Sequence, residues 1–266
     1  MADVLNWFRI LDTKIVVLGV ELEECWKKFE TQFQKSDIFI EILKETDWCY
    51  GIQSFPIKKG IEGCFKCGNS ILMMQDNWKK AKIYSDNEEM NSIQTFILLT
   101  IYSFVANKCM IQIHSSLIDY QGHGLMFLGP SGIGKTTQAE LWNQYRDALI
   151  INGDIVFVQE TEENFLGWGT PWHGSSPYCE NTNVPVDALI ILKQAPENSI
   201  RQLEGFEKVT AVSNSVFYPR WLENGMELCL ETLDHLLSKL PVYELSCRPD
   251  EEAVELTEKT IFGREH

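Results

Sequence analysis

The sequence of 266 residues lacks an excess of basic charge, a long apolar run and a dense set of cysteines. Its 23 Lys and Arg against 38 Asp and Glu give a net charge of −15, and so acidic a surface repels phosphate backbones. We therefore expect no nucleic acid among its main partners. Such a surface would attract a basic peptide, but most strongly acidic proteins are simply soluble.

The most apolar stretch, residues 93–113, is interrupted by Asn107, Lys108 and Gln112. Its apolar core of about ten residues is too short to span a bilayer, so we expect no membrane partner. Apolar residues nearly all round the segment predict a buried core helix over 91–107.

The eight cysteines are spread through the chain, and its first residues show no basic-then-apolar signal pattern. These features predict free thiols and a reducing, cytoplasmic compartment. Cys64 and Cys67 form a CxxC pair, but structural zinc needs four ligands and no second pair follows at a suitable spacing. Two ordinary thiols are favoured over a zinc site.

Hydrophobic residues make up 44% of the chain and charged residues 23%, which is typical of a folded globular protein. The polar segment 84–89 is the best boundary, and it predicts an N-terminal α+β accessory region over 1–90 and a second domain over 91–266. Strands are expected at 37–43, 47–55, 110–120, 125–128, 148–151, 155–159, 186–192 and 242–247. Helices are expected at 22–33, 91–107, 134–145 and 233–240, with a last one starting within 248–252.

Residues 129–136, GPSGIGKT, fit the phosphate-loop pattern G-x-x-x-x-G-K-[ST] between an apolar strand and a plausible helix. Glycines allow a tight loop whose backbone N–H groups close around phosphate oxygens at a helix N-terminus. Lys135 would reach the β- and γ-phosphates, and the Thr136 hydroxyl would bind Mg²⁺. The predicted nucleotide-binding residues are Gly129, Pro130, Ser131, Gly132, Ile133, Gly134, Lys135, Thr136 and Thr137.

Asp154 follows the next apolar strand and is well placed to face Mg²⁺ or to act as a base. Its alternative role is that of a turn residue, because Asn-Gly is a hairpin signal. The short link from strand 110–120 to strand 125–128 allows only antiparallel neighbours. The fold class is therefore α/β (α+β), with a mixed sheet, flanking helices and a hairpin that feeds the phosphate loop.

A strand bearing His114, a hairpin, GPSGIGKTT and an apolar strand ending in Asp154 together resemble the C-terminal kinase domain of HPr kinase/phosphorylase. That fold is related to the nucleotide core of phosphoenolpyruvate carboxykinase. The later part of the chain is similar to a more divergent branch of HPr-kinase-like proteins that are found with peptide-modifying enzymes and include kinases of lasso-peptide precursors. The segments that carry this similarity are 169–172, 184–192, 198–201 and 242–254. The resemblance covers residues 91–266.

The resemblance implies roles for single residues. Asp154 takes the place of the second acid of the family's pair, as base and metal ligand, while Gly153 replaces the first acid. His114 takes the place of the histidine that supports this acid, with an ordinary strand histidine as the alternative. His173 would face the same cleft or be a loop residue, and Arg201 would steady transferring charge or be solvated.

The function that follows is an ATP- and Mg²⁺-dependent kinase of a hydroxyl on a peptide or small protein. The alternatives are a metabolite kinase, including a carboxykinase, and a nucleotide-binding regulatory subunit that transfers no phosphate. The long loop 167–183, with Trp168, Trp172 and Tyr178, is either a lid or peptide-binding wall, or a structured surface loop. No Asn-Lys-x-Asp guanine signature marks the preferred purine, and the rings that HPr kinases form leave a homo-oligomer open.

Overall fold

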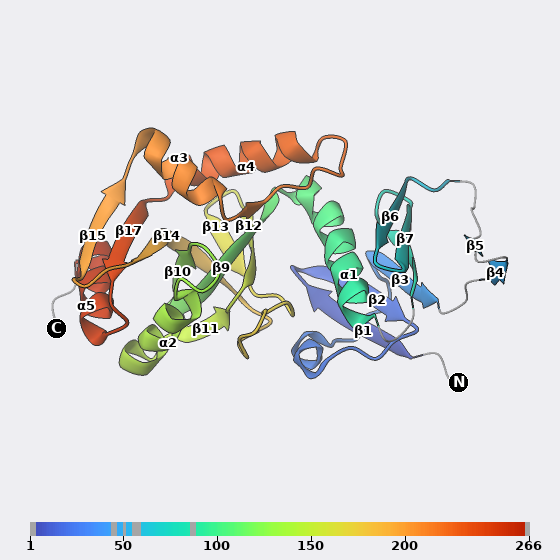
Figure 1. Ribbon diagram of the computed structural model, residues 1–266, viewed down its shortest axis with the longest axis horizontal. Coiled ribbons are helices and arrows are strands. Elements are labelled where there is room, and N and C mark those ends of the chain that lie inside the picture. The colour runs from blue at the N-terminus through green and yellow to red at the C-terminus, as the bar shows by residue number, and fades with distance from the viewer. Residues whose placement is uncertain (1–3, 44–46, 50–51, 55–59, 86–88, 264–266) are drawn as a thin grey trace. The chain divides into compact units, whose positions relative to one another are not determined.

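The computed structural model describes residues 4–43, 47–49, 52–54, 60–85 and 89–263. Within the predicted strand 47–55, residues 50, 51 and 55 lie outside this described part. The chain divides into two compact units, Met1–Asn107 and Lys108–His266 (Figure 1). Each unit is described by itself.

The first unit is built on a mixed sheet in the order β1-β2-β3-β8-β7-β6. Helix α1 packs on β7 and β8, and its buried apolar side chains are those of Ile93, Phe96, Ile97, Ile101, Tyr102 and Val105. The elements are β1 (Leu5–Ile10), β2 (Thr13–Leu18), η1 (Glu24–Phe29), β3 (Ile38–Leu43), β4 (Asp47–Cys49), β5 (Ile52–Ser54), β6 (Gly63–Cys67), β7 (Ser70–Gln75), β8 (Lys80–Tyr84) and α1 (Met90–Val105).

Two features of this unit differ from the sequence-based expectation. The helical spacing over 22–33 yields only the 3₁₀ segment η1, in which Trp26 and Phe29, three residues apart, are both buried on one side. Helix α1 belongs with the first unit, so the boundary expected at residue 90 falls between this helix and the strands that it packs on.

Cys64 and Cys67 lie on β6, three positions apart. Side chains three positions apart on a strand leave opposite faces, so this pair does not present two thiols to one ion. The cysteines at 25, 64, 67, 109, 179, 229 and 247 carry free thiols.

The second unit contains a nine-stranded mixed sheet in the order β10-β9-β12-β13-β14-β17-β15, with β11 and β16 also paired to β9. Strand β10 also pairs with β14, in parallel. The elements are η2 (Ala106–Lys108), which straddles the boundary, β9 (Met110–Tyr120), β10 (His123–Leu128), α2 (Lys135–Arg146), β11 (Leu149–Asn152), β12 (Ile155–Glu160), β13 (Phe165–Trp168), β14 (Asn183–Gln194), β15 (Ser199–Leu203), α3 (Gly205–Ser213), β16 (Val216–Phe217), α4 (Gly225–Lys239), β17 (Val242–Cys247) and α5 (Glu251–Phe262).

A hairpin feeds the phosphate loop, as predicted. Strands β9 and β10 are antiparallel, and Gln121 and Gly122 join them with φ of 56° and 86°, as a two-residue type I′ turn requires. Because β10 has an antiparallel neighbour on one side and parallel β14 on the other, the predicted mixed sheet is confirmed.

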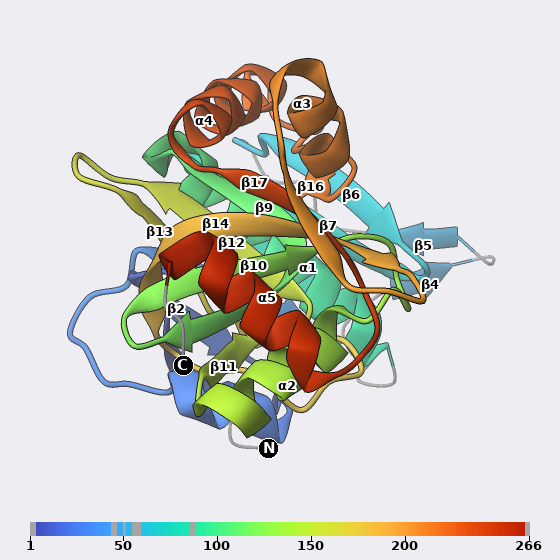
Figure 2. The ribbon, with the colours of Figure 1, turned by 90° about the vertical axis from the view of Figure 1, so that its left-hand side faces the viewer.

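Helices cover both faces of this sheet, with α3 and α4 on one side and α2 and α5 on the other (Figures 1 and 2). Leu233 and Leu236 of α4 join one apolar core, and Ala139 and Trp142 of α2 join the other. Among the described residues, no helix combines the length and the apolar character needed to cross a membrane.

A buried carboxylate ties α5 to the helix that follows the phosphate loop. Glu258 on α5 is 1% exposed and accepts hydrogen bonds from the Tyr120 hydroxyl of β9 and from Nε of Arg146 on α2, each at 2.6 Å. Since α2 begins at the phosphate loop, this contact fixes the far end of the helix that presents the loop.

Candidate active site

Residues 129–136 connect the end of β10 to α2, as the motif predicts. Gly129, Gly132 and Gly134 have φ of 141°, 78° and 113°, values that residues with a Cβ rarely adopt. These glycines let the loop curl over the first turn of α2, where free backbone N–H groups and the helix dipole attract anions.

Lys135 is held inside this loop. Its ammonium donates to the carbonyl oxygens of Gly129 at 3.1 Å and Pro130 at 3.2 Å, and the residue is 7% exposed. Burial lowers the pKa of Lys135 below its ordinary value of 10.5, and the negative charge of Asp154 opposes that shift. The loop thus holds one buried cation beside the space that phosphates would fill.

A cavity of about 230 Å³ lies over the loop and brings together most of the predicted site residues. Of the residues predicted to be catalytic or to bind the metal, His114, Lys135, Thr136, Asp154 and His173 line this cavity. Its full lining is His114, Ser131, Gly132, Gly134, Lys135, Thr136, Thr137, Gly153, Asp154, His173, Ser175 and Ser176.

The strands beside β9 place Asp154 at this cavity. Leu149 of β11 lies opposite Asp119 of β9, and Ile155 of β12 lies opposite His114, so β11 and β12 follow one another along β9. Gly153 and Asp154 link these two strands, and the Asp154 carbonyl oxygen accepts the backbone N–H of Ser115 at 3.0 Å. The register shift of β11 against β9 lies earlier, between Ile150 and Asn152. The link between β11 and β12 brings Asp154 to the cavity that Lys135 and Thr136 also line.

His114 and Asp154 form a pair, with 2.9 Å between Nε2 of the histidine and Oδ1 of the carboxylate. The two side chains are 26% and 31% exposed, which leaves them accessible from the cavity. Forty positions in sequence separate two side chains that the fold brings to within 2.9 Å of one another.

Asn152 holds the link between β11 and β12 in place, a role that sequence reasoning missed by interpreting this residue only as a turn signal. It is fully buried, and its Oδ1 accepts the backbone N–H groups of Asp154 at 2.8 Å and Ile155 at 3.0 Å. Its Nδ2 donates to the carbonyl oxygens of Thr170 at 2.9 Å and Trp172 at 3.2 Å. One side-chain amide therefore joins the Asp154 turn to the loop after β13.

The segment 173–176 fills the space beside Gly153. A Cβ added to Gly153 would lie 2.0 Å from Oγ and 2.7 Å from Cβ of Ser176. Ser176 Oγ donates to the His173 carbonyl at 2.9 Å, and His173 Nδ1 contacts the Ser176 carbonyl. The position at which the resemblance replaces the first acid by glycine thus has no room for a side chain.

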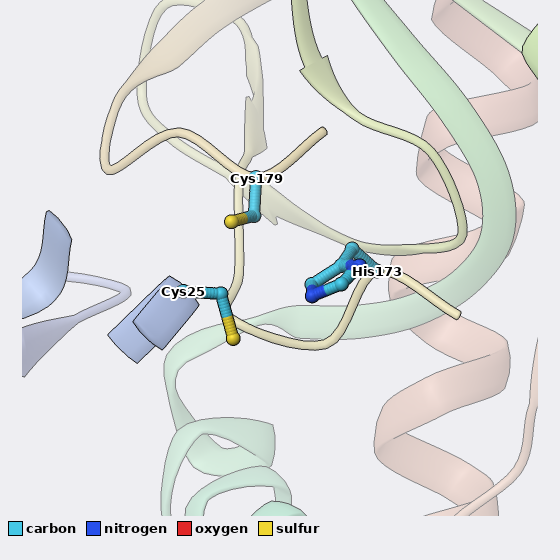
Figure 3. Close-up of side chains that lie close together, drawn as sticks. All are labelled: Cys25, His173 and Cys179. Carbon is cyan, nitrogen blue, oxygen red and sulfur yellow. The ribbon is translucent and has the colours of Figure 1, made fainter. Parts of the chain in front are cut away.

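Loop 167–183 is packed at several points. Trp172 and Cys179 are buried, and Glu180 donates its backbone N–H to Ile151 of β11 at 2.8 Å. Figure 3 shows the side chains of His173 and Cys179 on this loop. These contacts favour a structured loop over a freely moving lid.

Arg201 is not brought to the phosphate loop. It lies on β15, at the far edge of the sheet, where its guanidinium bonds Glu207 of α3 and Glu244 of β17 at 2.5–3.0 Å. These contacts raise the pKa of Arg201 above its ordinary value, with the hydrogen bonds to Glu207 as the largest cause. Its expected role in steadying transferring charge has no support in this geometry.

Thr136 and Asp154 offer the oxygen ligands that Mg²⁺ prefers, a hydroxyl and a carboxylate on one cavity. Thr136 Oγ1 lies 3.5 Å from the carbonyl oxygen of Gly153, at the limit of a hydrogen bond. The hydroxyl is therefore only weakly held by the protein, and this donor set fits the predicted metal.

A family model described as SynChlorMet cassette protein ScmC matches residues 80–248. The chain is 23% identical over 175 residues to an HPr kinase/phosphorylase of Mycoplasmopsis pulmonis (strain UAB CTIP), a match that covers 66% of this chain and 50% of that protein. The matched part thus spans about half the length of this curated relative. The Hpr(Ser) kinase/phosphatase structure from Coxiella burnetii aligns with 10% identity and a TM-score of 0.34, over 57% of this chain and 93% of that one.

Proposed function

The chain belongs to the family of SynChlorMet cassette protein ScmC, and we propose that it is an ATP- and Mg²⁺-dependent kinase. It transfers the γ-phosphoryl group of ATP to a serine or threonine hydroxyl of a peptide or small protein, most simply a ribosomal peptide precursor. The observation that carries this proposal is the His114–Asp154 pair, which lines one cavity together with the loop lysine Lys135. The distant similarity to HPr kinase/phosphorylase supports the same class of reaction.

The γ-phosphate and the nucleoside of ATP occupy two different cavities beside the phosphate loop. The α- and β-phosphates lie against the start of α2, and the chain from the α-phosphate then leaves past Thr137. A cavity of about 330 Å³ continues there, lined by Thr137, Gln138 and the loops after β14 and β17. Crevices at the carboxyl ends of parallel strands are where α/β sheets bind ligands, so the nucleoside belongs in this cavity. The γ-phosphate then faces Asp154.

In the transfer step the acceptor hydroxyl oxygen forms a bond to the γ-phosphorus while the bond to the β–γ bridging oxygen breaks, and ADP leaves. The hydroxyl proton passes to Oδ2 of Asp154, because Oδ1 faces His114, with 2.9 Å between Oδ1 and Nε2. A Cβ at Gly174 would lie 2.7 Å from Oδ2, so glycine at this position keeps the oxygen uncovered. His114 positions the carboxylate and does not take the proton.

Lys135 neutralises charge on the β- and γ-phosphates as the bond breaks. Thr136 and Asp154 are the residues that would hold Mg²⁺, which would offset the negative charge of the phosphates. His173, which also lines the cavity, contributes a ring that helps to close it against water.

The test uses the full chain with ATP and Mg²⁺. Because the family description names a cassette protein, short peptides encoded beside this gene are the first acceptors to try. The expected result is a gain of one phosphoryl group in the peptide mass, lost in Lys135→Ala and kept in Lys239→Ala, an exposed lysine on α4. Phosphate release without peptide labelling would point to idle hydrolysis, and tight nucleotide binding without any turnover to a regulatory subunit. Either result would contradict the proposal.

A further inference from the structure

A second cavity, of about 910 Å³, opens beside the phosphate loop between α3 and the sheet. Its volume falls within the roughly 300–1,000 Å³ usual for ligand pockets. Most of its walls are apolar, with Ile133 from the loop, Ile191 from β14, Leu203 from β15 and Ala211 from α3. Phe206, at the start of α3, stands at its edge with 85% of its surface exposed.

This cavity adjoins the reacting end of the phosphate site. His114 lines both this cavity and the smaller one over the loop. Gly129 and Pro130, at the start of the loop, also line it, whereas Thr137 and Gln138 line the cavity assigned to the nucleoside. An extended segment whose hydroxyl reaches Asp154 would therefore continue past His114 into the apolar cavity.

The charges at its edge pair among themselves. Lys193 bonds Glu244 at 2.5 Å, and Arg201 bonds Glu244 at 3.0 Å and Glu207 at 2.5 Å. Two cations and two carboxylates leave no net charge to attract a charged group from an occupant. Burying an uncharged apolar side chain is then favourable, while burying a charged one would cost its hydration.

We propose that this cavity binds an uncharged, apolar side chain of the acceptor peptide, within a few residues of the serine or threonine that receives the phosphate. This inference rests on the proposed function and names the class of its substrate. Leucine- or phenylalanine-sized residues fit the apolar walls, and Phe206 at the edge closes over them. The nucleoside is the other occupant that the cavity could take, and the experiment separates the two.

The probes are fluorescein-labelled serine peptides in a glycine-rich frame, with Leu, Phe, Lys or Asp placed from three residues before to three residues after the serine. Affinity is measured by fluorescence anisotropy with the full chain and a non-hydrolysable ATP analogue, and phosphate transfer is measured separately with ATP. At one position, Leu and Phe peptides should bind about tenfold more tightly than Lys and Asp peptides. Phe206→Ser should reduce that preference at least threefold.

Val209→Ser is the matched control, because Val209 is an exposed apolar residue on the same helix that does not line the cavity. It should leave the preference unchanged. Phosphate transfer with no preference for apolar neighbours would overturn this inference and leave the kinase proposal standing. Tighter binding of the Leu and Phe peptides without any phosphate transfer would support this inference and contradict the kinase proposal. Weaker ATP binding in Phe206→Ser, with unchanged peptide preference, would assign the cavity to the nucleoside and overturn the inference.

Discussion

Adding a single methyl group at Gly153 should destabilise the second unit, and removing the side chain of Ser176 should cancel the effect. The backbone of Gly153 is not in the left-handed region, so alanine fits its conformation. The obstacle is Ser176, whose Oγ and Cβ would lie 2.0 Å and 2.7 Å from the new Cβ. Rotating the hydroxyl removes the first clash but not the second, so segment 173–176 must move.

The size of the effect follows from two opposing contributions. Overpacking a close-packed site costs about 1–3 kcal/mol, and Gly→Ala at a compatible backbone gains roughly 0.4–1 kcal/mol through the unfolded chain. In Gly153→Ala the first contribution dominates. A loss of about 1–3 kcal/mol lowers the melting temperature of a unit of this size by about 2–12 °C.

The assay is a double-mutant cycle read by calorimetry on the full chain. Ser176→Gly alone should cost about 1 kcal/mol, because its hydroxyl no longer donates to the His173 carbonyl and its backbone gains freedom. In that background, however, Gly153→Ala should be neutral or raise the melting temperature by about 1–4 °C, because the next nearest atom, Thr136 Oγ1, is 3.8 Å away. Where calorimetry shows two transitions, Glu258→Gln identifies the one that belongs to the second unit, because that variant should lower its melting temperature.

Simple additivity in this cycle would refute the reasoning. If Gly153→Ala costs the same with and without the Ser176 side chain, then Ser176 is not the obstacle. An unchanged melting temperature in Gly153→Ala alone would show that segment 173–176 yields freely and does not fix the turn before Asp154.

Three further changes test other parts of the site. Asp154→Asn should lower kcat about 10²-fold or more in initial-rate assays, with a smaller change in nucleotide affinity. Normal turnover in this variant would show that Asp154 is not the general base. Because burial lowers the pKa of Lys135, ATP affinity should decline as pH rises through a value below 10.5, as measured by titration with a fluorescent analogue. Lys135→Arg should move this decline to higher pH. A decline at the same pH in the variant would show that Lys135 is not the group whose charge binds ATP. Glu258→Gln should cost about 3–5 kcal/mol in thermal unfolding, because Arg146 loses its buried carboxylate and Tyr120 its ionised acceptor, and a shift under 1 °C would contradict that pairing.

The contiguous parts of the site could be predicted from the sequence. The phosphate loop needs glycines, a lysine and a threonine within eight positions, and the hairpin before it needs only a short link between two apolar strands. Both depend on neighbours along the chain, so the pattern is visible locally. The pairing of His114 with Asp154 came only from a family resemblance, because β9 and the β11–β12 turn meet through sheet topology.

Residues whose roles depend on distant partners were not predictable. Asn152 looks like a turn residue until Thr170 and Trp172 are placed beside its amide. Gly153 has no local reason to lack a side chain, since its obstacle, Ser176, is 23 positions away. Arg201 resembled a catalytic arginine in its motif, but on the edge strand β15 its guanidinium is bonded to Glu207 and Glu244.

The hydrogen bonds of Lys135 to its own loop set how much this lysine could add to nucleotide binding under the proposed function. Its ammonium donates to the carbonyl oxygens of Gly129 and Pro130. A phosphate that took the ammonium would replace these two acceptors, so the lysine would contribute only the difference between two sets of bonds. On release of ADP the same carbonyl oxygens would stand ready to accept from the ammonium again, and no buried cation would be left without a partner. Such a loop would trade some affinity for easier release, which favours repeated turnover over tight retention of the product.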